Sequence, residues 1–319
     1  MNNKKIMIIG GTGALGKTLL KRYSSNNTIL IFSRDEHKHV NIQKGPLHNK
    51  NVHYIIGDVK DRDSIRNAID DFQPHVVINT AALKHVPICE SNAYESVKVN
   101  IIGHQNIIDV IKRSNHRIET LIFVSTDKAC KPINIYGMCK AISERLYIDF
   151  ANKQTDIKTC LVRYGNVLES TGSVIPFFKK LLKNGEKYLP ITHPEMTRFL
   201  LSLDQATDLI DWAYTHPNSH GKIAIPKIES LNIVDLARAI AKSCNREDIK
   251  FHKIPIRDGE KLHEEMISEI EFQRTEEFDS YYLIGYDKTN ESYDHQPFNS
   301  KYHVTNNVEE FLKKNNIII

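Results

Sequence analysis

A tyrosine and a lysine near the middle of the chain have the spacing of a proton-relay pair. Tyr136 and Lys140 stand four positions apart in the stretch STDKACKPINIYGMCK, so on a helix their side chains share one face. There the lysine ammonium can lower the pKa of the phenol, and Tyr136 can take a proton from a sugar or alcohol hydroxyl as hydride leaves for a nicotinamide. Thr126, at the end of the apolar run TLIFVST, can hydrogen-bond the same oxygen. These three residues predict an oxidation.

An acid and a second lysine, Asp127 and Lys128, follow Thr126 directly, and a plain hydride-transfer enzyme would not need them. A solvated ion pair, or an aspartate that caps a turn, is the simpler interpretation, since both residue types are common in loops. Their position after the carboxyl end of a strand favours catalysis instead, because the catalytic groups of open α/β sheets gather at that edge. Burial next to Lys84 would depress the pKa of Lys128 and make it a usable base.

The composition is that of a soluble globular protein, with 40% hydrophobic and 26% charged residues among 319. The formal net charge of +4 comes from acidic and basic residues mixed along the whole chain, which favours an enzyme for anionic small molecules over a nucleic-acid binder. No apolar run approaches the roughly 20 residues that span a bilayer, and the first residues lack the cleavage site of a signal peptide. The five cysteines have no Cys-x-x-Cys spacing, so we expect no disulfide framework, no metal site and a cytoplasmic location.

The hydrophobic pattern indicates the elements that must position these residues. Short β-rich runs alternate with amphipathic helical stretches, which predicts an α/β fold, a Rossmann-like doubly wound parallel sheet with helices on both faces. Strands are expected in KIMIIG, TILIFS, VHYIIGDV, VVINTAA, TLIFVST and TCLVRYGNV, and helices in GKTLLKRYS, SIRNAIDDF, IIGHQNIIDVIKRS and from near Lys140.

Three glycines follow the first expected strand and open a helix. Gly10, Gly13 and Gly16 in IIGGTGALGKTLL match the dinucleotide-binding fingerprint, in which glycines allow a tight turn and the approach of the backbone to pyrophosphate. The helix N-terminus supplies unpaired N–H groups and a partial positive charge. The strand, turn and helix context speaks against the alternative of a purely structural glycine turn.

The ends of the next two strands bear on which dinucleotide binds. An acid after the second strand holds the ribose 2′-hydroxyl of NAD, whereas an arginine accommodates the 2′-phosphate of NADP. Ser33 and Arg34 therefore favour NADP over NAD, although Asp35 leaves NAD open. Asp58, after the third strand, is the candidate acceptor for the adenine amino group, and a helix N-cap is a comparably good interpretation of it.

The pattern of the chain changes after residue 166. Residues 1–166 are expected to form the NADP-binding domain, and residues 167–319 mainly a smaller C-terminal substrate-binding lobe, with segments that could return to the main sheet. Helical patterns occupy SLDQATDLIDWAYTH and NIVDLARAIAKS. The polar stretch 287–300 is interpreted as a surface loop before a last short helix, VEEFLKKN.

Several motifs together resemble one branch of the extended short-chain dehydrogenase/reductase superfamily. They are similar to motifs of nucleotide-sugar 4,6-dehydratases of the polysaccharide-biosynthesis type, in particular the UDP-N-acetylglucosamine 4,6-dehydratases that invert C5. The resemblance runs from about residue 4 to about residue 285. Dehydratases that act on dTDP-glucose carry Asp-Glu where this chain has Asp127-Lys128. The motifs are GGTGALG, FSRDE, GDVKDRDSI, AALKHVPICE, NIIGHQNII, STDKACKPINIYGMCK, RYGNVLESTGSVIPFF, MTRFLLSL and RDGEKLHEEMIS.

The resemblance implies a role for the additional acid and lysine. Oxidation of C4 to a ketone makes the C5 proton acidic; Asp127 would then protonate the departing C6 hydroxyl, and Lys128 would remove the C5 proton. Hydride returns to C6 from a tightly bound, recycled NADP. The net reaction is dehydration of UDP-N-acetylglucosamine to a UDP-4-keto-6-deoxy-N-acetylhexosamine with C5 epimerisation, the first step of a deoxy-amino-sugar pathway for glycan synthesis. A nucleotide-sugar 4-epimerase or reductase, and a non-catalytic NADP-binding regulatory protein, are the competing interpretations.

The resemblance also implies the contacts of cofactor and substrate. Arg198, and Arg257 with Glu260, would hold the diphosphate and the uridine ribose, since a guanidinium matches phosphate oxygens two at a time. Either arginine could instead form a structural ion pair. The expected cofactor contacts are Gly10, Thr12, Gly13, Ala14, Leu15, Gly16, Ser33, Arg34, Asp58, Val59, Ala81, Ala82, Lys84, Asn100, Ser125, Tyr136, Lys140, Tyr164, Asn166 and Val167. The expected substrate contacts are Lys84, Asn166, Ser173, Val174, Thr192, Met196, Arg198, Arg257 and Glu260.

The apolar-striped segment NIIGHQNIIDVIK resembles the helix through which these enzymes pair. It predicts a homo-oligomer, either a dimer or a higher assembly such as a hexamer. The same stripe could equally pack against its own sheet, because periodicity does not distinguish the two. Neither a nucleic acid nor a membrane is expected as a partner.

Overall fold

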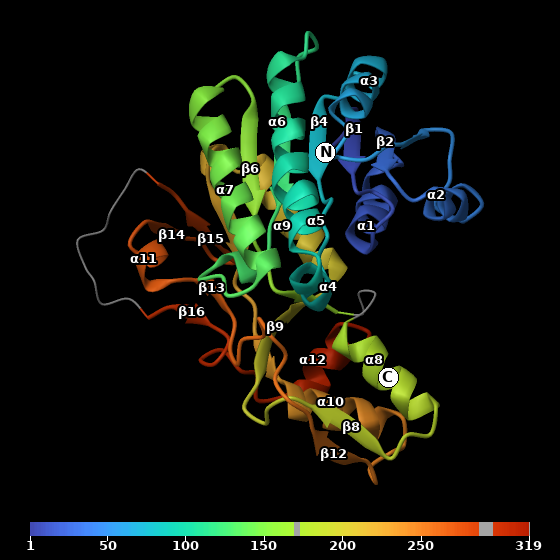
Figure 1. Cartoon of the computed structure of the whole chain (residues 1–319), viewed down its shortest axis with the longest axis vertical. Helices are drawn as coiled ribbons and strands as arrows, with labels where there is room; N and C mark the ends of the chain where they lie inside the picture. The colour runs from blue at the N-terminus through green and yellow to red at the C-terminus, as the bar shows by residue number, and fades with distance from the viewer. Residues whose placement is uncertain (169–172, 287–295, 319) are drawn as a thin grey trace.

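The computed structural model describes residues 1–168, 173–286 and 296–318. Within these ranges the main body is a nine-stranded sheet with helices on both faces, and a smaller lobe lies at one end of it (Figure 1). The strand order is β14-β15-β10-β6-β5-β4-β1-β2-β3. Neighbours from β3 to β10 are parallel, and β15 and β14 add antiparallel pairs at one edge. The predicted Rossmann-like doubly wound sheet is confirmed. Its strands are β1 Lys5–Ile9, β2 Thr28–Ser33, β3 Val52–Ile56, β4 Val76–Asn79, β5 Thr120–Val124, β6 Lys158–Val162, β10 Ile223–Pro226, β14 Thr275–Glu277 and β15 Tyr281–Ile284.

Successive side chains of a strand point to opposite faces of a sheet, so each face has its own apolar core. Met7 and Ile9 of β1 are buried in one core, and Ile6 and Ile8 in the other. Strands buried on both faces are continuous apolar runs in the sequence, which is why the pattern predicted them. The helices and short helical turns of this body are α1 Ala14–Tyr23, α2 Glu36–Gln43, α3 Arg62–Phe72, α4 Val86–Ser91, α5 Ala93–Val97, η1 Lys98–Ile102, α6 Gly103–Arg113, η2 Asp127–Ala129, α7 Ile135–Lys153, α9 Leu203–Thr215, η3 Pro217–Ser219 and α11 Glu269–Phe272.

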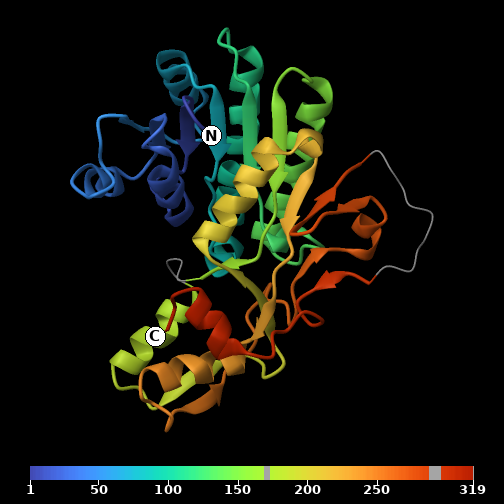
Figure 2. The same cartoon turned by 180° about the vertical axis from the view of Figure 1, so that it is seen from behind.

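The smaller lobe is built from segments that follow residue 165. Three of its strands form one sheet in the order β11-β9-β7, and two others, β12 and β8, pair in parallel. Its helices enclose a third apolar core, and the red C-terminal helix packs into this lobe (Figure 2). The elements are β7 Asn166–Val167, α8 Val174–Lys183, β8 Tyr188–Ile191, β9 Thr197–Leu201, β11 Ser230–Asn232, α10 Ile233–Ser243, β12 Lys250–Lys253 and α12 Val308–Lys314.

One helix that the sequence pattern grouped with the smaller lobe packs elsewhere. Helix α9 buries Ala206, Leu209, Ile210 and Ala213 in the core on the α1 face of the main sheet. Strands β10, β14 and β15 likewise extend the main sheet. The chain after residue 166 is therefore shared between both parts, because its apolar segments complete a sheet face and a sheet edge that the first half leaves open.

The interpretation of 287–300 as a surface loop is wrong at its end. Residues 287–295 lie outside the described part of the chain. Phe298–Asn299 forms β16, which pairs with β13 (Glu265–Ile267), and Ser300 is fully buried. The Ser300 hydroxyl accepts a hydrogen bond from the Glu264 N–H at 2.8 Å, so this polar residue has a structural partner that its local sequence does not reveal. Within the described ranges, none of the helices is both long and apolar enough to cross a membrane.

Candidate active site

The segment after β5 turns tightly at the carboxyl edge of the sheet. The Asp127 N–H donates to the carbonyl oxygen of Tyr164 at 2.9 Å, which ties the turn to the segment after β6. Thr126 is the N-cap of η2, and its hydroxyl oxygen accepts from the Lys128 N–H. These contacts place Thr126, Asp127 and Lys128 at the edge where the catalytic groups of α/β sheets gather.

Tyr136 and Lys140 both lie in the first turns of α7, so the predicted helix carries both of them. Lys140 is buried with its ammonium 4.0 Å from the centre of the Phe123 ring, and burial lowers its pKa to about 7. Burial raises the pKa of the Tyr136 phenol, the Asp127 charge raises it further, and a hydrogen bond with Thr126 opposes the rise. The expected lowering of the Tyr136 pKa is therefore wrong for this arrangement, because burial of the phenol dominates.

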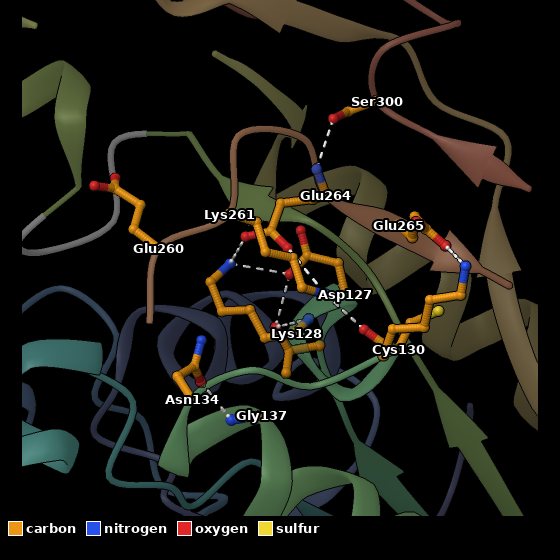
Figure 3. A network of polar contacts seen from close by, with 12 residues as sticks. Asp127, Lys128, Cys130, Asn134, Gly137, Glu260, Lys261, Glu264, Glu265 and Ser300 are labelled. Carbon is orange, nitrogen blue, oxygen red and sulfur yellow. Dashed lines mark hydrogen bonds and ion pairs between the residues drawn. The ribbon is translucent and has the colours of Figure 1, made fainter. Parts of the chain in front are cut away.

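Asp127 and Lys128 form a buried ion pair. Asp127 Oδ1 lies 3.1 Å from Lys128 Nζ and accepts from the Thr126 hydroxyl at 3.0 Å. Lys128 Nζ donates to Asn166 Oδ1 at 3.1 Å. Glu264 Oε1 lies 3.4 Å from the same ammonium, which points between the two carboxylates (Figure 3). Since Asp127 is fully buried, the interpretation of a solvated ion pair is wrong.

The surroundings of this pair decide where its proton resides. Burial raises the pKa of Asp127 despite the attraction of Lys128. Burial also disfavours the Lys128 ammonium, but the charges of Asp127 and Glu264 outweigh it and raise the pKa of Lys128. The expected depression of the Lys128 pKa is therefore wrong, because two carboxylates flank the ammonium. Each group of the pair therefore holds a proton more strongly than it would in water.

The turn at residues 126–128, which carries the candidate acid and base, is called the catalytic turn. Five residues form a buried network that holds both of its ends, and we call this network the Arg163 bracket. The Arg163 guanidinium donates to both oxygens of Glu144 (3.0 and 2.7 Å) and to both oxygens of Glu271 (3.1 and 2.9 Å). Glu144 accepts from the Ser125 hydroxyl at 2.6 Å, and Glu271 accepts from the Cys130 thiol at 3.4 Å. Ser125 and Cys130 flank the turn, so one guanidinium fixes its two ends through two carboxylates. Sequence reasoning missed this function of the network, because its members are individually ordinary residues.

The Arg163 bracket predicts a loss of stability in acid. Burial by itself raises the pKa of Glu271, but Arg163 outweighs it and lowers the pKa from 4.5 to about 2. A carboxyl whose pKa is depressed by folding stabilises the protein above its unfolded-state pKa; the stabilisation, about 3 kcal/mol here, is lost as pH falls from about 4.5 through about 2. Urea unfolding across this range measures it. The Glu271→Gln variant lacks the titrating group and should lose stability less steeply; equal slopes would contradict the assignment.

The predicted glycine turn lies between β1 and α1. Gly10 has a φ of +79°, and a Cβ there would lie 2.7 Å from the backbone nitrogen of Ala81. A Cβ on Gly16 would collide with the backbone of Gly11, so glycine is required for this close packing of helix against turn. Gly13 is the N-cap of α1 and provides no side-chain cap. The first N–H groups of α1 therefore have no side-chain acceptor at the cap, which fits an anion site.

The residues after β2 divide between the glycine turn and the next helix. The Thr12 and Ser33 hydroxyls hydrogen-bond at 2.7 Å, which joins the turn to the end of β2. Arg34 is exposed. Asp35 is the N-cap of α2: its carboxylate accepts from the Lys38 N–H and lies 2.9 Å from the Lys38 ammonium. Asp35, the acidic residue that could have held the ribose of NAD, therefore caps helix α2.

Asp58 does not cap the helix that follows it. The N-cap of α3 is Asp61, whereas Asp58 accepts from the Lys60 N–H at 3.0 Å and lies 3.6 Å from the Lys60 ammonium. The helix-cap interpretation of Asp58 is therefore wrong. Val59, next to it, is buried in the core.

The loop 81–84 after β4 is shaped by a buried amide. The side-chain oxygen and nitrogen of Asn100 bind the Leu83 N–H and carbonyl at 2.9 and 2.8 Å. His104 Nε2 lies 3.0 Å from a backbone oxygen of the same loop. Both polar atoms of the Asn100 side chain are therefore used in hydrogen bonds to this loop. Lys84 is open to solvent, and partial desolvation by the surrounding protein lowers its pKa.

On the substrate side, the two predicted arginines differ in their surroundings. Arg198 is buried, donates to the carbonyl oxygens of Thr197 and Lys261 at 2.7 and 2.8 Å, and lies 3.5 Å from Glu260 Oε1. Its guanidinium therefore ties the segment around Glu260 to β9, which is the structural alternative considered for it. Arg257 is exposed and is the one of the two whose side chain is open to an anion.

The remaining predicted contacts lie in or beside the smaller lobe. Ser173 is the N-cap of α8, which starts at Val174. The Thr192 hydroxyl donates to Met196 Sδ at 3.2 Å, and both side chains are buried. Tyr164 is also buried, and burial raises the pKa of its phenol. Thr192, Met196 and Tyr164 thus form part of the packed interior in this structure.

Comparisons with known proteins agree with this geometry. Residues 6–285 match the family described as "Polysaccharide biosynthesis protein". A protein of Campylobacter jejuni strain 81-176, named UDP-N-acetylglucosamine 4,6-dehydratase (inverting), is 44% identical over 294 residues, which cover 89% of this chain and 83% of that protein. A Rickettsia rickettsii protein named UDP-glucose 4-epimerase is 38% identical over 294 residues, covering 89% of this chain and 84% of that protein.

A solved structure of similar shape is the X-ray structure of Pen from Bacillus thuringiensis. It has a TM-score of 0.89 and 28% identity, and the match covers 100% of this chain and 99% of that one. The resemblance inferred from the motifs is confirmed. From its motifs, its sheet and these similarities together, the chain belongs to the polysaccharide biosynthesis protein family, within the extended short-chain dehydrogenase/reductase superfamily.

Proposed function

We propose that this chain is an inverting UDP-N-acetylglucosamine 4,6-dehydratase, a hydro-lyase that forms a UDP-4-keto-6-deoxy-N-acetylhexosamine with inversion at C5. The observation that carries the proposal is the buried Asp127–Lys128 pair, 3.1 Å apart, beside Tyr136. A pure oxidoreductase or epimerase has no use for such a pair, whereas elimination of water needs both an acid and a base. The similarity to the Campylobacter jejuni dehydratase supports it.

Each side chain has one step in this reaction. Tyr136, after its phenol has lost its own proton to solvent, takes the proton of the C4 hydroxyl while Thr126 hydrogen-bonds the same oxygen, and the resulting C4 ketone makes the C5 proton acidic. Lys128 passes its proton to Asp127, 3.1 Å away, so a single transfer creates both the base for C5 and the acid for the C6 hydroxyl. Burial favours this transfer, because two neutral groups cost less than two charges in a site that excludes water. A nicotinamide cofactor, when bound, would supply hydride acceptance from C4 and hydride return to C6, and a proton that comes from solvent to C5, on the face opposite Lys128, completes the inverted product.

We expect this site to bind NADP rather than NAD. The uncapped N-terminus of α1 and the glycine turn would hold the pyrophosphate. Beyond β2, Asp35 is engaged with Lys38, which leaves Ser33 and the exposed Arg34 to meet the adenosine ribose. An arginine in this place accommodates a 2′-phosphate. The cofactor is held tightly and recycled, because hydride leaves and returns within one turnover.

Replacement of Arg34 with alanine tests the cofactor assignment. Loss of a charge-assisted contact to phosphate, about 1.5–3 kcal/mol, should weaken NADP binding by about 10- to 100-fold and leave NAD binding nearly unchanged. Competitive fluorescence titration of protein stripped of cofactor measures both. Lys44→Ala, which removes an exposed cation at the C-terminal end of α2, is the matched control. An equal loss for NADP and NAD in Arg34→Ala would point to structural damage and refute the assignment.

The smaller lobe, with Arg257 exposed at its border, would bind the UDP part of the substrate, while residues 1–166 hold the cofactor. For assembly, the apolar residues of α6 are buried in the core of their own domain, so α6 itself offers little apolar surface to a partner. Tyr94, Ile102, Met138 and Ile142 are exposed on α5, η1 and α7, and they would form the contact of a homo-oligomer. All five cysteines are among the described residues and are free thiols, which suits a reducing cytoplasm.

The decisive experiment is an NMR time course of the purified protein with UDP-N-acetylglucosamine in D₂O without added cofactor. A new C6 methyl signal with deuterium at C5 is expected, and ring proton couplings report C5 inversion. A 4-epimer as the sole product would favour the second candidate, an epimerase, which the similarity to the Rickettsia protein suggests. No turnover with retained NADP would favour a non-catalytic binding protein.

A further inference from the structure

We infer that Glu264 is a positioning residue for the catalytic pair: it holds the Lys128 ammonium in place and adjusts the proton affinity of Lys128 and Asp127. This assignment rests on the proposed function, since it concerns the base and acid of the elimination. It adds a third charged group, from a different part of the chain, to the two that the catalytic turn supplies.

The first support is geometric. Glu264 Oε1 lies 3.4 Å from Lys128 Nζ, and the side chain is 3% exposed. Its backbone is held on both sides by Ser300, since the Glu264 N–H donates to the Ser300 hydroxyl and its carbonyl accepts from the Ser300 N–H, each at 2.8 Å. The carboxylate therefore approaches the ammonium from a rigid strand end opposite the turn (Figure 3).

The second support is the set of partners that this carboxylate lacks. Among the described residues, Glu264 Oε2 is buried and has no hydrogen-bond partner, and the same holds for Asp127 Oδ2. The Lys261 ammonium is 3.9 Å from Glu264 Oε2, beyond hydrogen-bond distance. A carboxylate kept only for stability would be expected to satisfy both oxygens. This one faces the ammonium instead, at an energetic cost that a positioning function explains.

The charges around the group determine the direction of its effect. A negative charge at Glu264 raises the proton affinity of both Lys128 and Asp127, because it attracts a bound proton at either atom. The opposing cations are Lys261 and Arg198: both favour the ionised Glu264 carboxylate, and the Arg198 charge disfavours the Lys128 ammonium. The titratable or charged groups that act on this cluster are Asp127 and Lys128 from η2, Arg198 from β9, Lys261 and Glu264 from the segment before β13, and Tyr136 from α7.

Further contacts link residues 259–264 to the catalytic turn. Lys261 Nζ donates to the Cys130 carbonyl oxygen at 2.7 Å (Figure 3). Asn134 donates its amide N–H to the Gly259 carbonyl at 2.8 Å. Residues 259–264 therefore lie along the catalytic turn and the start of α7. Within this segment Glu264 contacts the Lys128 ammonium. The position of Lys128 therefore depends on how residues 259–264 pack against the catalytic turn.

The test compares Glu264→Gln with the parent holoenzyme and with Glu265→Gln, a matched control whose carboxylate pairs with Lys131 instead. UDP-N-acetylglucosamine is the substrate. The absorbance of reduced cofactor in a single turnover reports C4 oxidation, and NMR reports C5 deuteration and the C6 methyl group. Glu264→Gln should slow dehydration about 10²-fold, because a misplacement of about 1 Å costs that much, with C4 oxidation retained. Glu265→Gln should resemble the parent.

The pH profile separates positioning from a merely structural role. Without the Glu264 charge, both limbs of the dehydration profile should move to lower pH, by about one unit or more for a charge this close. Glu264→Asp, which keeps the charge, should keep the limbs near those of the parent and covers the case in which the glutamine variant folds poorly. Unchanged dehydration in Glu264→Gln, or slowed dehydration with unmoved limbs, would overturn the inference. A parent that forms no 6-deoxy product would instead overturn the proposed function, and this assignment with it.

Discussion

Replacing Lys128 with methionine is expected to slow formation of the 6-deoxy product by about 10³-fold, the range of a lost general base, while C4 oxidation proceeds within a few-fold of the parent rate. In the proposed mechanism the oxidation would depend on Thr126, Tyr136 and Lys140, whereas the elimination would depend on the Asp127–Lys128 pair. The variant should therefore accumulate the 4-keto sugar and reduced cofactor. Single-turnover absorbance and NMR of quenched samples measure the two steps separately.

Lys131→Met is the matched control for this variant. Lys131 is three residues farther along and pairs with Glu265 and Glu269 at 3.0 and 2.5 Å, but its side chain is 46% exposed. Its loss should leave both steps within a few-fold of the parent, because exposed ion pairs contribute little. If Lys128→Met slowed C4 oxidation as much as dehydration, the assignment of Lys128 to the elimination alone would be wrong.

Replacing Arg163 with methionine is expected to lower the free energy of unfolding by about 3–5 kcal/mol, the cost of leaving buried charges without their partner. Arg163 is 1% exposed and satisfies both oxygens of Glu144 and of Glu271. Without it, two carboxylates remain in the protein interior. Urea unfolding monitored by circular dichroism measures the loss. Because the bracket holds both ends of the catalytic turn, the folded fraction of the variant should also lose dehydration activity.

The control for Arg163→Met uses another arginine with several acidic partners. Arg22 faces Asp204, Asp208 and Asp211, and its side chain is 30% exposed. Arg22→Met should cost about 1 kcal/mol or less, since solvent screens those charges. Arg163→Lys keeps the charge but not the paired geometry of the guanidinium, and should fall between the two. Equal losses for Arg163→Met and Arg22→Met would contradict the importance assigned to the bracket.

Local pattern was sufficient for the sheet, the glycine turn and the placement of the catalytic turn. The strands of a parallel sheet are buried on both faces, so each leaves a continuous apolar run in the sequence. Glycine is required at two positions because a Cβ there would collide with nearby backbone. For Gly10 this is the backbone of Ala81, after the adjoining strand β4, and for Gly16 it is the backbone of Gly11. Tyr136 and Lys140 share a helix because four residues make about one turn. These features depend on short-range geometry, which residue spacing encodes.

The spacing of residues in the sequence could not predict the pKa values of the site. The sequence suggested that Lys128 is a base with a depressed pKa, but Glu264 and Asp127 raise it. It likewise suggested a lowered pKa for Tyr136, which burial raises. A pKa depends on depth of burial and on every charge within a few ångströms. Both are properties of packed segments that stand far apart in the chain.

The arginines show most clearly what the sequence predicts and what only the tertiary structure reveals. Sequence alone determined the fold class, the glycine turn after β1 and the identity of the residues that follow β5. The tertiary structure decided that Arg198 binds backbone carbonyls and that Arg163 holds the catalytic turn through Glu271, 108 residues away. It also brought Glu264 to Lys128. Such contacts join elements that meet only when the C-terminal segments fold back on the sheet, so no local spacing could predict them.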